Sequence, residues 1–543
     1  MSTVQNPSVT LTDLSFAWPD GTPVINGITA AFGTGRTGLL GANGTGKTTL
    51  LRLITGELAP TAGAIGIAGR VGHLPQHLVL ETGATVADLL EVRAGLDALR
   101  AIESGDTDAR HFEVLGDAWD IESRARASLD AIGLSHLSLD RTVGTLSGGE
   151  TMLAALAGLR MRGDEVVLLD EPTNNLDRRA RHDLYDVVLA WQGALIVVSH
   201  DVALLDLMDD TAELYSRSLT VFGGNHSAYR QYLEQEQAAA ERALRTAEQK
   251  VKIEERQRIE AQTKLARRQR YARTDFENKR KPKLIMNQRK TEAQVSAGKL
   301  RGELDEKVAA ARAAAERQAE RVRRDAHIRI DLPDPALAST RRLVELGDRR
   351  GTAIPVQGPE RVALTGPNGI GKTRLLTALV EGRENTDGRV RAVRYTDRVG
   401  YLPQRLDHLD GDVSILDTVR AAAPRTPPGD VRAQLARFLF RADDVHLHVR
   451  DLSGGERFRV ALATLLLADP ANRLLVLDEP TNNLDLRSVD ELVSALDSYR
   501  GGLIVVSHDD AFLARLRIDT WVTLDEDGLA LGEPLVTDSE KKQ

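Results

Sequence analysis

Two stretches of the chain have the composition of a phosphate-binding loop. GANGTGKT at 41–48 and GPNGIGKT at 366–373 each follow a strand-like run and open a helix-like one. Glycines let the backbone curl so that N–H groups point at phosphate oxygens, and the following helix N-terminus adds partial positive charge. In this P-loop pattern, Lys47 and Lys372 reach the β- and γ-phosphates. One such stretch could be a chance glycine-rich turn, but two copies in the same context indicate two nucleotide sites.

Paired acids end two apolar runs, VVLLDE and LLVLDE. Such a run is typical of a buried parallel strand, so the acids lie at the C-terminal edge of a sheet, where ligands bind. The second acids, Glu171 and Glu479, are placed to orient or deprotonate an attacking water. The alternative, strands that simply end in solvated acids, does not explain the P-loops upstream. The first acids are placed to hold Mg²⁺ with the P-loop threonines, Asp170 with Thr48 and Asp478 with Thr373.

LSGGE occurs at 146–150 and again at 452–456. Ser and Glu three residues apart before a helical pattern form a capping box, which by itself indicates only that a helix starts. The two glycines inside the cap, however, leave bare N–H groups at a positive helix end, which suits an anion. The helix-start interpretation and the anion-binding interpretation both remain open from these residues alone.

These motifs belong to an internal repeat. VGHLPQ returns as VGYLPQ, VVLLDEPTNNLD as LLVLDEPTNNLD, and LIVVSHD is repeated unchanged. From Asp170 to His200, and from Asp478 to His508, the gap is 30 residues in both copies. The chain therefore contains a tandem duplication of one domain of about 220 residues.

Between the copies, over residues 230–325, the composition changes to Ala, Glu, Gln, Arg and Lys. The segment from Tyr229 to Lys281 has no Gly or Pro, which predicts a long helix. A three–four spacing predicts a second helix through Leu300, Leu304, Ala311, Ala315 and Val322. We expect an antiparallel hairpin that turns near 270–290, with helices of about 35 residues and about 50 Å.

The hairpin is the basic part of an acidic protein. Residues 241–325 carry 25 Lys/Arg and 14 Asp/Glu, whereas the whole chain has a net charge of −8. Residues 264–290 hold 11 Lys/Arg against only Asp275 and Glu277. A solvated coiled-coil face usually mixes both signs. A nearly all-basic turn instead predicts contact with a phosphate backbone, and Tyr271 and Phe276 could stack on bases or pack within the hairpin.

Length and composition limit the remaining classes. The 543 residues exceed one ordinary domain, and with no cysteine the chain can form no disulfide. The N-terminus lacks the pattern of a secretory signal, and no run approaches the roughly 18 apolar residues of a membrane span. We expect a cytoplasmic protein.

P-loop, LPQ glutamine, LSGGE, acidic strand, NNLD and SHD, in this order, resemble the nucleotide-binding domain of the ATP-binding-cassette (ABC) family. The resemblance covers most of residues 9–228 and 340–525. It implies ATP and Mg²⁺ as ligands, and two cassettes that close head to tail, so that the LSGGE signature of each caps the ATP held by the other. The histidines would be switch residues that contact the γ-phosphate, and the LPQ glutamines would contact Mg²⁺ and water.

The resemblance assigns residues to each site. The first site would use Trp18, Gly41, Asn43, Gly44, Gly46, Lys47, Thr48, Thr49, Gln76, Asp170, Glu171 and His200, with Ser453, Gly454 and Gly455 across it. The second would use Gly366, Asn368, Gly369, Gly371, Lys372, Thr373, Arg374, Gln404, Asp478, Glu479 and His508, with Ser147, Gly148 and Gly149 across it. The implied Mg²⁺ ligands are Thr48, Gln76 and Asp170, and Thr373, Gln404 and Asp478.

The chain departs from the family pattern at two places, the aromatic position of the second half and the pair after the first signature. Trp18 lies where the family stacks an aromatic ring on adenine, although a core or surface Trp would give the same sequence. The second half has no aromatic residue in the corresponding LPDPALASTRRLVELGDRRG. After the first signature, Thr151-Met152 replaces the polar or basic pair that ERFRVA keeps. Both glutamates and both histidines are present, so we predict that both sites hydrolyse ATP.

Two fused cassettes with a helical linker resemble the ABC-F subfamily. The expected fold is α/β, with ABC domains over 1–228 and 326–543 joined by an antiparallel α-helical hairpin over 229–325, which resembles the P-site tRNA interaction motif. The resemblance implies a monomer whose cassettes dimerise within the chain. It also implies ATP-dependent binding to the 70S ribosome near the tRNA exit site, with contacts to 23S rRNA and tRNA, and a role in translation or antibiotic resistance.

The distance from the LPQ glutamine to the signature serine differs between the halves. It is 71 residues from Gln76 to Ser147 and 49 from Gln404 to Ser453. We therefore expect an insertion around 95–120, a short form of an arm that some members use on the ribosome. A transporter ATPase with separate membrane subunits would explain the cassettes but not a basic hairpin. A scaffold that binds ATP without turnover would not need both glutamates.

Overall fold

A computed structural model describes residues 8–76, 83–277, 283–322, 332–383, 389–440, 442–482 and 484–532. Some helical side chains, including those of residues 271–294, lie outside the described part. The chain divides into two units, one made of Met1–His226 and His327–Gln543, the other of Ser227–Ala326. Among the described helices, none combines the length and the apolar character needed to cross a membrane.

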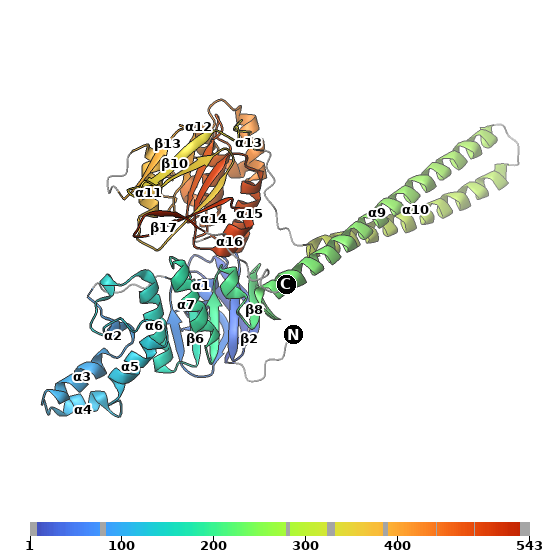
Figure 1. Ribbon diagram of the computed structural model, residues 1–543. Coiled ribbons are helices and arrows are strands. Elements are labelled where there is room, and N and C mark those ends of the chain that lie inside the picture. Colours follow the sequence, from blue (N-terminus) through green and yellow to red (C-terminus); the bar gives the residue numbers. More distant parts are fainter. Residues whose placement is uncertain are drawn as a thin grey trace, which may run out of the picture. The chain divides into compact units, whose positions relative to one another are not determined.

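The first cassette is α/β (Figure 1). Its larger sheet has the order β5-β6-β7-β3-β8-β9, parallel except for β9, and its smaller antiparallel sheet has the order β2-β1-β4. Its strands are β1 (Val9–Ala17), β2 (Pro23–Phe32), β3 (Gly35–Leu40), β4 (Ala62–Ile67), β5 (Val71–Leu74), β6 (Val166–Asp170), β7 (Ala194–Val198), β8 (Asp210–Tyr215) and β9 (Ser218–Gly223). Its helices are α1 (Lys47–Ile54), α2 (Val86–Leu89), α3 (Arg93–Glu103), α4 (Ala109–Leu115), α5 (Ile121–Asp130), the 3₁₀ turn Val143–Thr145, α6 (Gly148–Arg162), α7 (Arg178–Leu189) and α8 (Val202–Leu205).

The second cassette repeats this topology. The corresponding orders are β14-β15-β16-β12-β17-β18, parallel except for β18, and β11-β10-β13. Its strands are β10 (Arg342–Asp348), β11 (Ala353–Gln357), β12 (Arg361–Thr365), β13 (Val390–Arg394), β14 (Val399–Leu402), β15 (Leu474–Asp478), β16 (Gly502–Val506), β17 (Thr520–Leu524) and β18 (Leu529–Leu531). Its helices are α11 (Lys372–Glu381), α12 (Ile415–Ala422), α13 (Pro428–Arg437), the 3₁₀ turns Ala442–His446 and Val449–Asp451, α14 (Gly454–Leu466), α15 (Leu486–Ser498) and α16 (Asp510–Arg515).

The central strands fix the positions of the acids. Every residue of β6, β7, β15 and β16 is buried, as expected for apolar strands inside a parallel sheet. Asp170 pairs in register with Val198, and Asp478 with Val506. Both aspartates are therefore the last residues of central strands, at the C-terminal edge that the sequence predicted.

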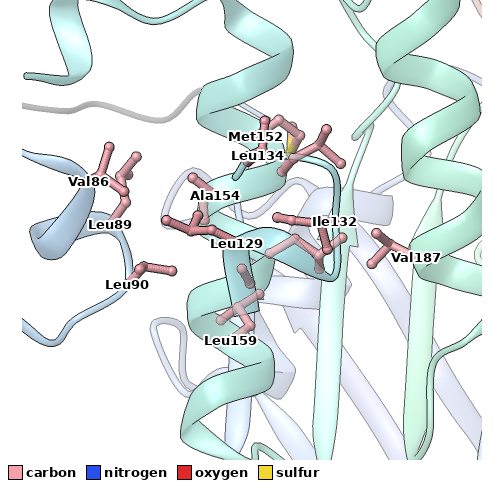
Figure 2. Close-up of a cluster of buried hydrophobic side chains, with 14 of the residues drawn as sticks. Val86, Leu89, Leu90, Leu129, Ile132, Leu134, Met152, Ala154, Leu159 and Val187 are labelled. Carbon is pink, nitrogen blue, oxygen red and sulfur yellow. The ribbon is translucent and has the colours of Figure 1, made fainter. Parts of the chain in front are cut away.

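The signature helix α6 is anchored by its own hydrophobic cluster. Figure 2 shows Met152, Ala154 and Leu159 of α6 with Leu129 of α5 and Leu90, which follows α2, in one buried group. Phe458 of α14, at the position equivalent to Met152, is also buried. Met152 is therefore a core residue in a position that is buried in both cassettes, and the departure from the family pair is confined to Thr151, where the second cassette has Arg457.

The insertion expected around 95–120 corresponds to α3 and α4. These helices contact each other and lie at one end of the first cassette in Figure 1. Phe112 and Trp119 form a tilted ring pair 6.2 Å apart, and both side chains are substantially exposed.

The second unit is a pair of long helices, α9 (His226–Glu277) and α10 (Lys283–Arg321). They run side by side in Figure 1, and ion pairs join Arg312 to Glu255 at 2.5 Å and Arg258 to Asp305 at 3.5 Å. At 52 and 39 residues the helices are longer than the 35 that we expected. α9 starts before Tyr229, and α10 continues through two glycines. Of the basic side chains expected at 264–290, those from residue 271 onward lie outside the described side chains.

Candidate active sites

The first P-loop opens onto a cavity of about 480 Å³. All of its lining residues but Val24 and Asn174 were predicted from the sequence. The lining consists of Trp18, Val24, Asn43, Gly44, Gly46, Lys47, Thr48, Thr49, Gln76, Asp170, Glu171, Asn174 and His200. Lys47 also contacts Gly41, the remaining P-loop residue of the predicted set.

The second P-loop opens onto a cavity of about 940 Å³. It brings together all the predicted residues of the second site's own cassette except Gly366, whose carbonyl accepts a hydrogen bond from Lys372. The lining consists of Asn368, Gly369, Ile370, Gly371, Lys372, Thr373, Arg374, Arg389, Val390, Gln404, Asp478, Glu479, Asn482, Val506 and His508, with Asn175 and Leu176 of the first cassette.

The P-loop backbones suit phosphate binding. Gly46 and Gly371 precede α1 and α11 with φ of 102° and 107°, a conformation that a residue with a Cβ rarely adopts. No side chain caps either helix, so the first N–H groups keep their capacity for an anion. Lys47 Nζ donates to the Gly41 carbonyl at 2.6 Å, and burial lowers the pKa of both P-loop lysines.

The strand-end aspartates are nearly inaccessible, with 2% of Asp170 and 1% of Asp478 exposed. Burial raises the pKa of both carboxyls, while hydrogen bonds from Thr48 and Thr373 lower it. Oδ2 of each aspartate has no protein partner among the described residues. A buried carboxylate oxygen beside a P-loop threonine has the chemistry of a cation ligand.

The glutamates adopt a strained backbone conformation. Glu171 has a φ of 50° and Glu479 a φ of 48°, in the left-handed region that side chains rarely adopt. Their N–H groups donate to Val198 and Val506 of the adjacent strands at 2.8 and 2.9 Å. The neighbouring sheet therefore holds each carboxylate at the end of its strand.

Each glutamate lies beside the switch histidine of its own cassette. Glu171 Oε1 is 3.0 Å from His200 Nε2, and Glu479 Oε1 is 3.3 Å from His508 Nε2. The same histidine nitrogens lie 3.4 and 3.2 Å from the Nζ atoms of the P-loop lysines. Lysine, glutamate and histidine thus converge in both sites, although they come from three separate motifs.

Electrostatics are most strongly perturbed in the second site. Burial raises the pKa of Glu479 to about 7, against the lowering effects of Arg181 and Lys372. Burial lowers the pKa of His508 to about 3, and the cations of Lys372 and Arg181 lower it further. A glutamate with a pKa near neutrality is suited to accept a proton from water.

The signature motifs form the predicted helix starts. Ser147 caps α6 and Ser453 caps α14, each in a full capping box with the glutamate three residues later. Both serines are exposed and line neither P-loop cavity. The role of the signatures across the sites, including Gly148, Gly149, Gly454 and Gly455, stays a prediction.

The NNLD loops contact the P-loop of the other cassette. The Asn175 carbonyl accepts a hydrogen bond from Asn368 Nδ2 at 2.9 Å, and Asp485 Oδ2 accepts one from the Asn43 N–H at 2.8 Å. Burial raises the pKa of Asp485, but hydrogen bonds from Asn43 and Ser488 lower it below its usual range. The sequence motifs do not assign Asn175 or Asp485 to a site individually, although NNLD repeats in both halves.

The linings of the two cavities differ in their aromatic and basic residues. Trp18 lines the first cavity, is 37% exposed and packs edge-on against Phe16 at 5.1 Å. Among the described residues that line the second cavity there is no aromatic side chain, and Arg374 and Arg389 lie there instead. Arg389 was missed because no motif marks it.

Comparisons with known proteins agree with this geometry. The ABC transporter family model matches residues 27–174 and 352–482. The tylosin resistance ATP-binding protein TlrC of Streptomyces fradiae is 33% identical over 530 residues, which cover 91% of this chain and 93% of the relative. The probable ATP-binding protein YheS of Escherichia coli K12 is 29% identical over 531 residues, 92% of this chain and 76% of the relative.

The solved structures include one of similar fold and extent. An archaeal ribosome recycling factor, aABCE1, solved in complex with the ribosomal stalk protein aP1, aligns with a TM-score of 0.54 and 20% identity over 96% of this chain and 88% of that one. At this identity the likeness concerns the fold. Together with two P-loop sites in tandem, these comparisons place the chain in the ATP-binding-cassette family, as an ATPase of the ABC-F type.

Proposed function

We propose that this ATPase is a cytoplasmic protein that binds the 70S ribosome near the tRNA exit site in its ATP-bound state and leaves after hydrolysis. The observation that carries the proposal is the paired helices α9 and α10, a unit of their own inserted between two complete cassettes. A basic hairpin over 229–325, with its charge concentrated at 264–290, suits ribosomal RNA and tRNA phosphates. The name of the relative TlrC favours protection against a ribosome-targeting antibiotic over a general translation role.

The energetic link between ATP and ribosome binding is the contact between cassettes. We propose that ATP, bound by one P-loop and capped by the other cassette's signature, favours a closed state that binds the ribosome. The exposed capping boxes at Ser147 and Ser453 present helix N-termini suited to the γ-phosphate. Hydrolysis removes the shared ligand and therefore favours release.

In each site, Glu171 or Glu479 would orient and deprotonate water, and His200 or His508 would contact the γ-phosphate. The residues present also fit Mg²⁺, because Asp170 and Asp478 each offer a buried carboxylate oxygen without a protein partner among the described residues. The threonine hydroxyls and the glutamine carbonyls, from Thr48, Gln76, Thr373 and Gln404, complete an oxygen donor set. When bound, the ion would neutralise charge on the phosphates.

The decisive experiment replaces Glu171 and Glu479 by Gln together and separates lysates on sucrose gradients with ATP. We expect the double variant to accumulate with 70S particles, because the closed state forms and cannot hydrolyse its ATP. The matched control adds Lys47→Ala and Lys372→Ala, which prevents the closed state. Accumulation in membranes instead would favour an ATPase subunit of a transporter and overturn the proposal.

A second experiment tests the hairpin. Arg267, Arg268, Arg270, Lys279, Arg280 and Lys281 are changed to Glu in the Gln-substituted chain. We expect weaker and more salt-sensitive sedimentation with 70S particles, while ATP binding is retained. The control reverses Arg242, Arg245 and Lys250 of α9, outside the basic cluster. Equal losses in the two sets would contradict a specific role for 264–290.

A further inference from the structure

The helix that follows each NNLD loop differs in charge between the cassettes. Asp177 precedes α7 and Asp485 precedes α15, so positions along the two helices can be matched directly. Three matched positions are charged or polar in α7 and aliphatic in α15. These pairs are Arg178 and Leu486, Arg181 and Val489, and Tyr185 and Val493.

Arg181 is bound to the aspartate behind the first switch histidine. Only 8% of its surface is exposed, and its guanidinium Nη1 is 3.2 Å from Asp201 Oδ2. The Tyr185 hydroxyl donates to the same oxygen at 2.6 Å. Asp201 also caps α8 by accepting from the Leu204 N–H, and it follows His200 directly. Arg181 and Tyr185 therefore fix the segment that carries His200.

Among the described residues of its own cassette, the aspartate behind the second switch histidine has no matching arginine or tyrosine partner. Asp509 follows His508 and caps α16 through the Phe512 N–H at 2.9 Å. The positions that match Arg181 and Tyr185 in its own cassette are Val489 and Val493. The basic residue that lines a cavity with Asp509 is Arg181 of the first cassette.

One small cavity is lined by Arg181 together with both aspartates, Asp201 and Asp509. It has a volume of about 20 Å³, enough for one water molecule, and Arg181, Asp201 and Asp509 all line it, as do Glu171 and His200. Two of these lining residues carry a buried nitrogen without a protein partner among the described residues, Nε of Arg181 and Nδ1 of His200. The neighbouring Arg178 Nη2 is 2.5 Å from Asp510 Oδ1, so the cationic helix and the acidic loop also meet beside the cavity.

We propose that Arg181 is a positioning residue shared by the two ATP sites, which holds the aspartate behind each switch histidine and so makes hydrolysis at both sites depend on one side chain. This inference rests on the proposed roles of His200 and His508. Without the guanidinium, Asp201 and Asp509 would face each other as two buried like charges, which destabilises both loops. Consistent with one cation between two acids, burial and Asp201 raise the pKa of Asp509 whereas Arg181 lowers it.

The test measures ATP turnover against ATP concentration in the isolated full-length chain. E479Q leaves only the first site active, and E171Q leaves only the second. In both backgrounds we expect R181Q to lower kcat by about tenfold with KM changed less than about threefold, because displaced loops misplace the reacting groups while the P-loops still bind ATP. R181K keeps a cation but lacks the planar fork of donors, so its turnover should fall between those of R181Q and the unsubstituted chain. R179Q, on the exposed face of the same helix, is the control and should change neither constant.

A fall in kcat confined to the E479Q background would overturn the proposal, because the second site would then not depend on Arg181. A change in KM alone, or an R181K variant as slow as R181Q, would also overturn it. Should R181Q fail to fold, Y185F provides the test, since it removes one donor to Asp201 and keeps the cation. We expect Y185F to lower kcat about two- to threefold in both backgrounds, and unchanged kcat in either would count against the coupling. None of these assays contains ribosomes, so their failure is distinguishable from failure of the ribosome proposal.

Discussion

A tryptophan lines the first ATP site, whereas two arginines line the second, whose cavity is about twice as large. The reacting groups, in contrast, coincide in both: a buried lysine, a strand-end aspartate, a strained glutamate and a histidine within about 3.5 Å of its neighbours. The two cassettes thus share the candidate reacting groups and differ in the residues beside them, so we expect them to differ in how they recognise the base. The first site should be selective for adenine, and the second should accept a wider range of nucleotides.

The two cassettes also differ on the strand that pairs with each acidic strand, at the matching positions His73 and Tyr401. His73 of β5 lies 3.4 Å from Glu57, whereas Tyr401 occupies the matching position in β14. Burial and the carboxylate of Asp478 raise the pKa of Tyr401 to about 12, so its hydroxyl remains protonated. The two sites thus differ in the residue that acts electrostatically on the strand-end aspartate, His73 in the first and Tyr401 in the second.

The largest expected effect tests whether both sites catalyse. The double variant E171Q/E479Q should lose at least about 100-fold of the phosphate release rate, because a positioned general base contributes roughly 10²–10⁴-fold. Each single variant should retain turnover from the remaining site, measured as steady-state phosphate release. A single substitution that abolishes all turnover would show that the sites are not equivalent in chemistry.

A smaller effect concerns the raised pKa of Glu479. Folding raises this pKa to about 7, so the neutral carboxyl stabilises the folded state at low pH, and that contribution is lost as the pH rises through 7. E479Q stays neutral, so its stability gain over the wild type should grow by about 2 kcal/mol between pH 5.5 and 8. Denaturant unfolding of the nucleotide-free protein would measure this trend. E526Q, at an exposed glutamate, should show none.

A more modest difference between the two sites is expected in the effect of W18A on the KM for ATP. With only the first site active, in E479Q, W18A should raise the KM for ATP about tenfold, because stacking on a base is worth roughly 1–3 kcal/mol. With only the second site active, in E171Q, W18A should leave the KM unchanged. GTP should also compete with ATP more effectively at the second site. Equal effects of W18A in both backgrounds would remove the asymmetry.

The smallest effect is expected from the ion pair between Arg178 and Asp510. Both side chains are more than one-third exposed, so the pair should contribute at most about 1 kcal/mol. R178L, which copies Leu486 of the second cassette, should therefore shift the free energy of unfolding only slightly, as measured by denaturant titration. A loss of several kcal/mol would mean that this pair, rather than Arg181, is the main charge contact between α7 and α16.

The catalytic core was predictable because its motifs are local. Each P-loop, each acidic strand end and each histidine is a short contiguous pattern, and the buried strands β6 and β15 leave their aspartates only one place to lie. The same argument predicted the paired helices, since 53 residues without Gly or Pro admit few other structures. The length of α10 was underestimated because it passes through Gly298 and Gly302 without ending, and that of α9 because it begins at His226 and continues to Glu277.

What the sequence could not predict depends on pairs of distant residues. Arg389 directly precedes β13 and lines the second cavity. No sequence motif or spacing connects it to the P-loop. Arg181 belongs to no sequence motif, and only the fold shows its contact with Asp201, which lies 20 residues later in the chain. Met152 looked like a missing polar residue until the helix packing showed it to be the counterpart of Phe458.

The length of α9 has a mechanical consequence. A helix of 52 residues rises about 78 Å, so a small tilt at one end would displace the other end by several ångströms. If its base tilted by about 5°, the far end would travel about 7 Å, the scale of one or two nucleotides of a nucleic-acid strand. In the proposed function, a change of a few ångströms at Glu171 and Glu479 would then produce a larger movement at the far end of α9.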